Sequence, residues 1–337
     1  MTHQTTAPAS SSSRSSGLSP ETWQKAQREL HEDPSVLDTH VQSVRDLIVT
    51  RPDVRFLRTD KEFVLRFLRA KKFDISETFK TLARYFEVRQ KRPGLLAHLS
   101  AEDADIRESL LGGFPGVLRD LDPFGRRVLV FFAANWEEWL FRYTHVLRAL
   151  VLSLEYLLED PETQVNGFAV VIDWTGVTFK QVSSLTPATM KMTIEIFQDC
   201  FPGRLGGIHM INQPWYVEAA VTMCKPFLKE STRRKIHFHG NNLSTLHAKI
   251  HREMLPAELG GANPPYNHFS WAKTLIGCNF TPKMHNNDTS SHLDLAQLEY
   301  EAERFNLPES KPNVATLEVS SSTEPKQTDP RPLISLE

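Results

Sequence analysis

The sequence has few cysteines and lacks the spacings that would make them a structural framework. Its 337 residues contain three cysteines, Cys200, Cys224 and Cys278, which are far apart along the chain. An odd number of dispersed thiols favours neither a disulfide framework nor the paired spacing of a zinc site. We therefore expect a reducing compartment, in which these thiols serve as small buried apolar side chains.

Long apolar runs and targeting segments are also missing. The most apolar stretch, residues 145–158, contains Arg148 and Glu155 and is shorter than the roughly 18 apolar residues that a membrane-spanning helix needs. The first 17 residues have no apolar core typical of a signal peptide, and Thr2 excludes N-myristoylation. We expect a cytoplasmic protein whose contact with membranes is peripheral and reversible.

An excess of charge of one sign is absent as well. The chain has 39 Lys and Arg residues against 41 Asp and Glu residues, and its formal net charge is -2. A dedicated nucleic-acid binder usually shows a basic excess, so no nucleic-acid partner is expected. Attraction to an acidic surface must therefore come from local basic clusters.

Known catalytic motifs are missing from the sequence. It contains no GxGxxG, no P-loop and no GxSxG, and the glycines of residues 112–116 precede a strand instead of opening a helix. His237 and His239 share one face of a predicted strand, where a polar face is favoured and a metal pair stays open. Asp173 ends another strand, where a loop-capping role is favoured over a catalytic one. We expect a protein that is not an enzyme and has no cofactor or metal.

The first part of the chain is predicted to be helical. Residues 1–18 are rich in serine, which is typical of disorder. Ser19 is the expected N-cap of a helix with Pro20 at its first position. Helical spacing of apolar residues then continues, and Pro93 and Gly94 are expected to end this block. We assign residues 19–99 to a small all-helical lobe.

Short apolar runs alternate with amphipathic helices in the second part. The runs are residues 127–133, 167–173, 207–211 and 235–239, and the helices are residues 144–158, 187–197 and 214–228. This alternation predicts an α/β domain with a mainly parallel sheet, over residues 100–279. Residues 280–337 are polar and predicted to be mostly disordered, with a short helix over residues 293–305.

Five segments resemble signatures of the CRAL-TRIO lipid-binding family and follow one another in the family's order. They are residues 65–73, 199–214, 225–228, 239–242 and 255–261. The resemblance covers roughly residues 19 to 275 and implies a lipid-binding domain with a mobile lid helix, preceded by a helical lobe. Within the family, residues 131–136, 164–168 and 212–216 look most like the clavesins, followed by the tocopherol and retinaldehyde carriers.

The resemblance implies a closed pocket for one hydrophobic lipid. Exposing a chain of about 15 carbons costs roughly 12 kcal/mol at about 0.8 kcal/mol for each methylene, so a carrier needs a dry cavity. The positions that match pocket residues of the tocopherol carrier are apolar with the exception of Thr193. They are Leu147, Val151, Leu154, Ile172, Val177, Thr193, Ile196, Phe197, Phe201 and Ile208.

The helix after Pro214 has an apolar stripe and is the expected lid. A stripe at four-residue spacing usually packs in a core. The resemblance instead favours a lid that covers lipid when closed and contacts membrane when open. The stripe consists of Trp215, Ala219, Met223 and Phe227, and it is widened by Tyr216 and Ala220.

The resemblance also implies a basic site for phosphoinositide head groups, although a solvated surface run stays open as the alternative. Each Lys or Arg near an anionic surface contributes about 1 kcal/mol, and Arg offers bidentate geometry to phosphate. The tocopherol carrier has a second basic residue where this chain has Gly206, so a differently shaped site is expected. The clavesin-like pattern implies phosphatidylinositol 3,5-bisphosphate. The candidates are Lys71, Arg204, Arg233, Arg234 and Lys235.

The end of the sequence matches a clathrin-box pattern at Leu333, Ile334, Leu336 and Glu337. An extended peptide of this kind inserts alternate apolar side chains into a groove. A chance match stays open, because the pattern is short. The resemblance to clavesins implies clathrin heavy chain or adaptors as partners, and location on trans-Golgi network, early endosome and clathrin-coated vesicle membranes.

Three hypotheses for function follow. The first is a lipid and phosphoinositide binder for lipid sensing or transfer in clathrin-dependent traffic between trans-Golgi network, endosome and lysosome. The second is a retinoid or tocopherol carrier. The third is a scaffold or GTPase-regulatory module whose lipid pocket is vestigial.

Overall fold

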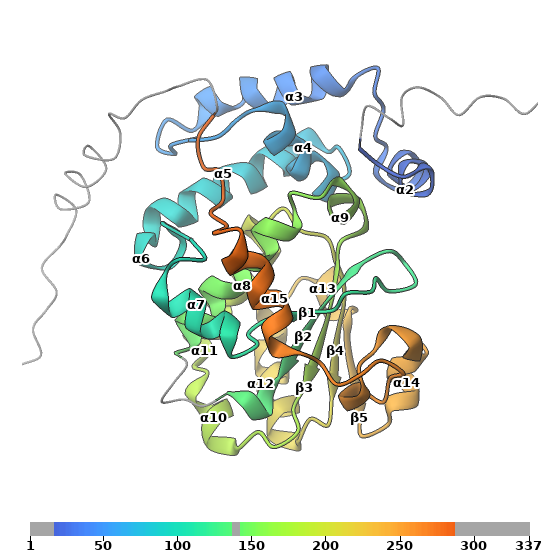
Figure 1. Cartoon of the computed structure of the whole chain (residues 1–337). Helices are drawn as coiled ribbons and strands as arrows, with labels where there is room; N and C mark the ends of the chain where they lie inside the picture. The colour runs from blue at the N-terminus through green and yellow to red at the C-terminus, as the bar shows by residue number, and fades with distance from the viewer. Residues whose placement is uncertain (1–16, 137–141, 287–337) are drawn as a thin grey trace, which may run out of the picture. The chain divides into compact units, whose positions relative to one another are not determined.

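The computed structural model describes residues 17–136 and 142–286, in which helices come first and strands follow (Figure 1). Ser19 caps the first helix and Pro20 opens it, which confirms the predicted start. Pro93 and Gly94 open a further short helix, so the prediction that they end the helical block is wrong. Proline is tolerated in the first turn of a helix because its missing N–H has no intrahelical partner there. The first helices are α2 (Pro20–Lys25), α3 (Leu37–Asp46), α4 (Lys61–Ala70), α5 (Ile75–Lys91), α6 (Pro93–Leu96) and α7 (Ala104–Leu111).

Five strands form one sheet in the order β1-β2-β3-β4-β5. The short edge strand β1 is antiparallel to β2, and the other neighbours are parallel, which confirms the α/β fold with a mainly parallel sheet. Gly206 lies at a β-bulge, because Phe168 pairs with Leu205 while Ala169 pairs with Gly207. The strands are β1 (Gly116–Val117), β2 (Arg127–Phe132), β3 (Phe168–Asp173), β4 (Leu205–Ile211) and β5 (Ile236–Gly240).

Helices connect and flank these strands. Two predicted helices are shorter than expected: the helix from Pro187 turns into a π-helix after Glu195, and the lid helix ends at Cys224. Pro226 follows within a 3₁₀ turn, because proline lacks the N–H that would continue the α-helix. The helices are α8 (Tyr143–Leu157), α9 (Pro161–Asn166), α10 (Phe179–Ser184), α11 (Pro187–Glu195), α12 (Trp215–Cys224), α13 (Glu230–Arg233), α14 (Leu243–His247) and α15 (His268–Gly277).

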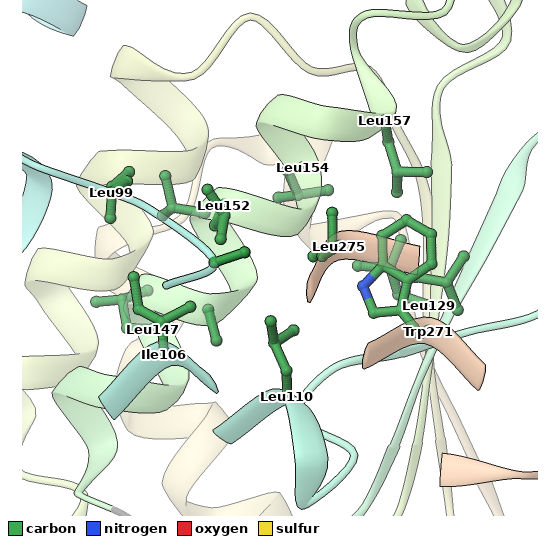
Figure 2. Close-up of a cluster of buried hydrophobic side chains, with 14 of the residues drawn as sticks. Leu99, Ile106, Leu110, Leu129, Leu147, Leu152, Leu154, Leu157, Trp271 and Leu275 are labelled. Atoms are coloured by element: carbon green, nitrogen blue, oxygen red, sulfur yellow. The ribbon is translucent and has the colours of Figure 1, made fainter. Parts of the chain in front are cut away.

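Apolar side chains fill both faces of the sheet. On one face, side chains of α7, α8 and α15 meet those of β2, and Figure 2 shows Ile106, Leu110, Leu147, Leu275 and neighbouring residues pointing toward one another. Val128 belongs to a second cluster, which includes residues of α14 and the loop after it. Successive residues of a strand point to opposite faces, so a continuous apolar strand feeds two cores.

A buried carboxylate joins the helices of the first part to α8. Tyr85 Oη and Arg89 Nη2, both from α5, donate to Glu155 Oε1 at 2.8 and 2.7 Å. Arg66 Nη1 of α4 lies 3.9 Å from the other oxygen of this carboxylate. Glu155 is 2% exposed, so these contacts replace the water that the charge would otherwise need.

A second buried pair links α4 to α9. Arg69 donates from Nε and Nη2 to the two oxygens of Glu32 at 2.9 and 2.7 Å, and from Nη1 to Gln164 Oε1 at 2.8 Å. A guanidinium in this bidentate geometry has its direction fixed. The two ionic groups therefore set the orientation of α4 against α8 and α9.

The residues after α15 return to the helical part. Ala101 N donates to Phe280 O at 2.9 Å, Arg58 donates to Lys283 O at 3.1 Å, and Thr59 N donates to Asn286 Oδ1 at 2.8 Å. Residues 280–286, predicted as part of the tail, are thus bonded to loops that connect the first helices. The described elements belong to one compact unit that ends at Asn286, and a boundary at residues 99/100 stays a prediction. The helix predicted over residues 293–305 lies outside the described residues.

Within residues 17–136 and 142–286, no helix has the length and apolar character that crossing a bilayer requires.

Replacing Glu155 with Gln should lower the free energy of unfolding by about 3 kcal/mol, because Arg66 and Arg89 lose a buried counter-charge while some hydrogen bonds remain. Urea denaturation followed by circular dichroism measures the change. Glu62→Gln, which removes an exposed carboxylate from α4, is the matched control and should leave the midpoint nearly unchanged. Equal losses in the two variants would contradict the role assigned to Glu155.

Candidate functional site

Nine of the ten predicted pocket residues belong to two apolar groups of the interior, and the tenth, Thr193, is half-buried. One group is the core between α8, the π-helix and the sheet, with Leu147, Val151, Leu154, Ile196 and Phe201, and Phe197 packs against it. The other group lies under α12 and includes Ile172, Val177 and Ile208. None of the ten is classed as exposed. That they line a lipid cavity stays a prediction.

A pair of hydroxyls gives this apolar region a polar point. Tyr143 Oη lies 2.8 Å from Thr193 Oγ1, which donates to Thr189 O at 2.9 Å. Burial raises the pKa of the Tyr143 hydroxyl, so this group stays neutral. Tyr143 was missed from the sequence, where a lone tyrosine at the start of a helix gives no functional signal.

A cavity of about 560 Å³ lies elsewhere, beside the edge strand β1. Its lining includes Val117, Arg119, Tyr266 and Trp271, and none of the ten predicted pocket residues. Charged and apolar side chains share this lining, so the cavity lacks the apolar character expected of a site for a lipid chain.

The lid helix α12 is apolar on two faces. Val217 is buried, and Tyr216, Ala220 and Val221 pack against the group under the helix, where Tyr216 Oη donates to Val177 O at 2.7 Å. Four-residue spacing places the predicted stripe on the other face: Trp215 is 75% exposed, Met223 is 65% exposed and Phe227 is 40% exposed, and Ala219 is exposed as well. The expectation that this stripe covers the interior is therefore wrong for the described conformation, because Val217 and Val221 fill that position.

The end of the lid is fixed by one side chain of the π-helix. Gln198 Oε1 accepts from Lys229 N at 2.6 Å, and its Nε2 donates to Phe227 O at 3.4 Å. Lys191 lies 5.7 Å from the centre of the Phe227 ring. These contacts hold the segment after α12 close to α11.

Two of the five predicted basic residues come together at the amino ends of the parallel strands. Burial lowers the pKa of Lys235, and the nearby charges of Arg204, Arg126 and Lys72 lower it further. Arg204 Nη2 lies 4.0 Å from Glu29 Oε2, and its Nη1 is buried without a hydrogen-bond partner among the described residues. A like-charged group with unused donors is typical of an anion site.

The other three predicted basic residues lie in different surroundings. Arg233, at the end of α13, and Arg234, which follows it, both pair with Glu230, at 2.8 and 3.0 Å. Burial lowers the pKa of Lys71, and the nearby charge of Lys229 lowers it further. The grouping of all five residues is therefore not what the contacts indicate. Arg126 and Lys72 were missed, although each stands beside another basic residue in the sequence.

Three histidines stack between β4 and β5. The rings of His209 and His237 are 5.0 Å apart, and His209 Nδ1 lies 3.0 Å from His239 Nε2. Burial, followed by these two neighbours, lowers the pKa of His209 to about 3. Across the described ranges, no group of three or more His, Cys, Asp or Glu side chains has an arrangement that fits a metal ion. His209 is a third member of this cluster that the sequence did not indicate.

Comparisons with known proteins identify relatives of this chain. Residues 111–261 match the family model of the CRAL/TRIO domain. The chain is 50% identical over 288 residues to Clavesin-1 of Pongo abelii, which covers 82% of this chain and 81% of that protein. It is 46% identical over 321 residues to Clavesin-2 of Homo sapiens, which covers 95% of this chain and 98% of that protein.

A solved structure shares the fold. The crystal structure of Sfh5 matches with a TM-score of 0.51 over 83% of this chain and 98% of that chain. The sequence identity is 17%, so the likeness concerns the fold alone.

The pKa of His209 predicts how stability depends on pH. Its ordinary pKa is 6.5 and the folded value is about 3, so between these values the unfolded chain binds one more proton than the folded chain. The stability that this group contributes is complete above about pH 6.5 and falls toward about pH 3, by at most about 1.4 kcal/mol per pH unit.

Urea midpoints measured across this range should fall less steeply in His209→Asn than in the unchanged chain. His251→Asn, which removes an exposed imidazole, is the control and should keep the original slope. A His209→Asn profile parallel to that of the unchanged chain would refute the assignment.

Proposed function

We propose that this chain, which belongs to the clavesin family and carries a CRAL/TRIO domain, binds one hydrophobic lipid under α12 and meets phosphoinositide-containing membranes with its lid and its basic end. The activity is non-enzymatic lipid sensing or transfer. The single observation that carries the proposal is the pair of apolar faces on α12, one packed inward and one exposed.

A surface helix that is apolar on both sides needs a second apolar environment. Folding alone explains the inward face, with Val217 and Val221, but not an outward face with Trp215, Met223 and Phe227. Phe179 of α10 is 61% exposed, and its ring centre lies 5.6 Å from that of Tyr216, so the apolar surface extends beyond α12. Contiguous exposed apolar surface of this kind fits a membrane interface.

The interior beneath the lid supports the lipid part of the proposal. The predicted pocket residues on α8, β3 and β4 are apolar, and the hydroxyls of Tyr143 and Thr193 provide one polar point for orienting a ligand. Ligand sites for apolar molecules usually combine such a lining with few polar groups. Displacement of α12 would open this region beside the surface that touches the membrane.

The basic end, which consists of Arg126, Arg204 and Lys235 at the amino ends of the parallel strands, supports the phosphoinositide part of the proposal. Arg204 and Lys235, with Arg126 beside them, form a cationic group, and one terminal nitrogen of Arg204 is buried without a partner among the described residues. An inositol head group with phosphates supplies the anionic oxygens that such donors lack. We propose phosphatidylinositol 3,5-bisphosphate as the lipid, following the resemblance to clavesins.

The place of action that we propose is the cytoplasmic face of trans-Golgi network, endosome and clathrin-coated vesicle membranes. The clathrin-box match at Leu333, Ile334, Leu336 and Glu337 would recruit clathrin or an adaptor. These four residues lie outside the described residues, so this part rests on the sequence pattern.

Replacing the outward face should separate membrane binding from lipid retention. In the double variant Trp215→Ser with Met223→Ser, we expect binding to phosphoinositide vesicles to weaken by about tenfold, because two exposed apolar side chains no longer enter the interface. Vesicle flotation measures binding, and native mass spectrometry measures the lipid that remains in the pocket. Phe269→Ser on α15, which also removes an exposed ring, is the matched control and should bind as the unchanged chain does.

The same spectra test the ligand class. A phospholipid or other long-chain lipid that stays bound in the double variant supports the proposal. A retinoid or a tocol in the pocket favours the simple carrier instead. Unchanged flotation of the double variant would contradict the membrane role of α12.

Two charge-matched double variants test the basic end. Arg204→Gln with Lys235→Gln should abolish the preference for phosphoinositide over phosphatidylserine vesicles, because the unpaired donor of Arg204 and the charge of Lys235 are lost. Arg233→Gln with Arg234→Gln removes the same charge from α13 and should weaken binding to both vesicle types alike, with the preference retained. Flotation at two salt concentrations distinguishes these outcomes, and equal preferences in the two variants would contradict the assignment.

A further inference from the structure

The space that a side chain at position 206 would occupy is filled by Arg126. A Cβ built on Gly206 would overlap Arg126 Nη1 and lie 2.7 Å from its Cζ. Gly206 is the extra residue of the bulge in β4, and Arg126 directly precedes β2, two positions away across the sheet order. A side chain at position 206 would therefore displace the guanidinium from the place that it occupies beside this glycine.

The direction of this guanidinium is fixed by a buried carboxylate. Arg126 Nε donates to Asp122 Oδ2 at 2.5 Å, and the Asp122 side chain is 0% exposed. The other oxygen of Asp122 accepts from the backbone N–H groups of Phe124 and Arg126, each at 2.9 Å. The Arg126 Cζ also lies 4.6 Å from the centre of the Phe124 ring.

The terminal nitrogens of Arg126 are left for another partner. Among the described residues, neither Nη1 nor Nη2 has a hydrogen-bond acceptor, whereas Nε is bonded to Asp122. A guanidinium that is anchored through Nε presents its two terminal N–H groups in a plane, which is the geometry that binds two oxygens of one phosphate.

Further cations surround this position. The charges of Arg126 and Arg204 both act on Lys25 and on Lys235. Lys25 Nζ is bonded to Phe124 O at 3.0 Å and to Asn166 Oδ1 at 2.8 Å, so it contributes charge with two of its protons already used. Arg126, Arg204 and Lys235 are thus three cations that directly precede β2, β4 and β5 at one edge of the sheet. Multiply charged phosphate is the chemistry that they suit.

We propose that Arg126 is a phosphate-binding residue and that it holds one phosphate of a polyphosphorylated inositol group. This inference rests on the proposed phosphoinositide function and adds the residue that shapes its site. Gly206 and Arg126 act as one unit, since the first makes room for the second. The loop before β2 thereby supplies a positive charge beside β4, which has a glycine at position 206.

The first test is Arg126→Gln in the full chain, with binding to phosphatidylcholine vesicles that contain 5% phosphatidylinositol 3,5-bisphosphate, about one anionic lipid in twenty. We expect the dissociation constant to rise by about five- to tenfold, the effect of one charge-assisted phosphate contact. Lys273→Gln, which removes one exposed positive charge from α15, is the control and should change binding less than twofold, about the size of a screened surface effect. Unchanged binding of Arg126→Gln would overturn the inference.

The second test leaves Arg126 in the sequence and displaces it. Gly206→Ala introduces the methyl group that the guanidinium excludes, and it should weaken binding as much as Arg126→Gln does. Combining the two should add nothing, because both remove the same contact. Arg126→Gln with Gly206→Lys returns a charge to this position and should restore part of the affinity, whereas additive losses or no recovery would overturn the inference.

Thermal unfolding of each variant reports whether the fold is kept. If either Arg126→Gln or Gly206→Ala is unstable, the other single variant still tests the inference. Calorimetric titration with a soluble inositol trisphosphate shows whether Arg126 serves binding of a lipid head group or binding of a free soluble phosphate compound. Parallel losses for vesicles and soluble ligand support head-group binding by Arg126. Loss for the soluble ligand alone would overturn the lipid assignment. If the unchanged chain shows no phosphoinositide preference, the proposed function fails as well; if the preference exists and survives both variants, the Arg126 inference alone fails.

Discussion

The buried carboxylate of Glu155 is the contact on which the rest of the arrangement depends. It holds Tyr85 and Arg89 of α5 and lies close to Arg66 of α4, so two helices from the first part of the chain are fixed to α8. A buried charge tolerates little displacement of its partners, because each partner replaces lost water. The position of α4 and α5 against the sheet domain is thereby set by charge as well as by apolar packing.

This arrangement places two kinds of chemistry at different ends of the same strands. Lys235 directly precedes β5, and burial lowers its pKa. The nearby charges of Arg204, Arg126 and Lys72 lower this pKa further. The lid begins at Trp215, just after β4 ends at Ile211. Parallel strands carry all their amino ends to one edge and all their carboxyl ends to the other. Because β4 and β5 are parallel, the segment that contains α12 returns from the carboxyl edge to the amino edge, where the basic residues lie.

The lid and the basic end answer different physical demands of a lipid binder. Hydrocarbon must be kept from water at about 0.8 kcal/mol for each methylene, which requires a cover with an apolar inner face. A membrane surface is recognised by apolar contact and by charge, which requires an exposed apolar face and cations with free donors. Val217 and Trp215 on one helix, and Arg126 beside Gly206, are the parts of this chain that meet these demands.

The sequence by itself determined the fold class, the start of the first helix at Ser19 and the apolar strands, because periodicity and capping are local properties. It also identified the family through ordered motifs. It did not reveal which apolar face of α12 turns inward, since two faces are apolar and only the packing of the helix in the fold decides between them. The partners of Glu155 and the approach of Arg126 to Gly206 join residues 66 to 89 positions apart, so the tertiary structure alone decided them. Long-range contacts of this kind have no periodic signature, because each depends on where separate elements meet in space.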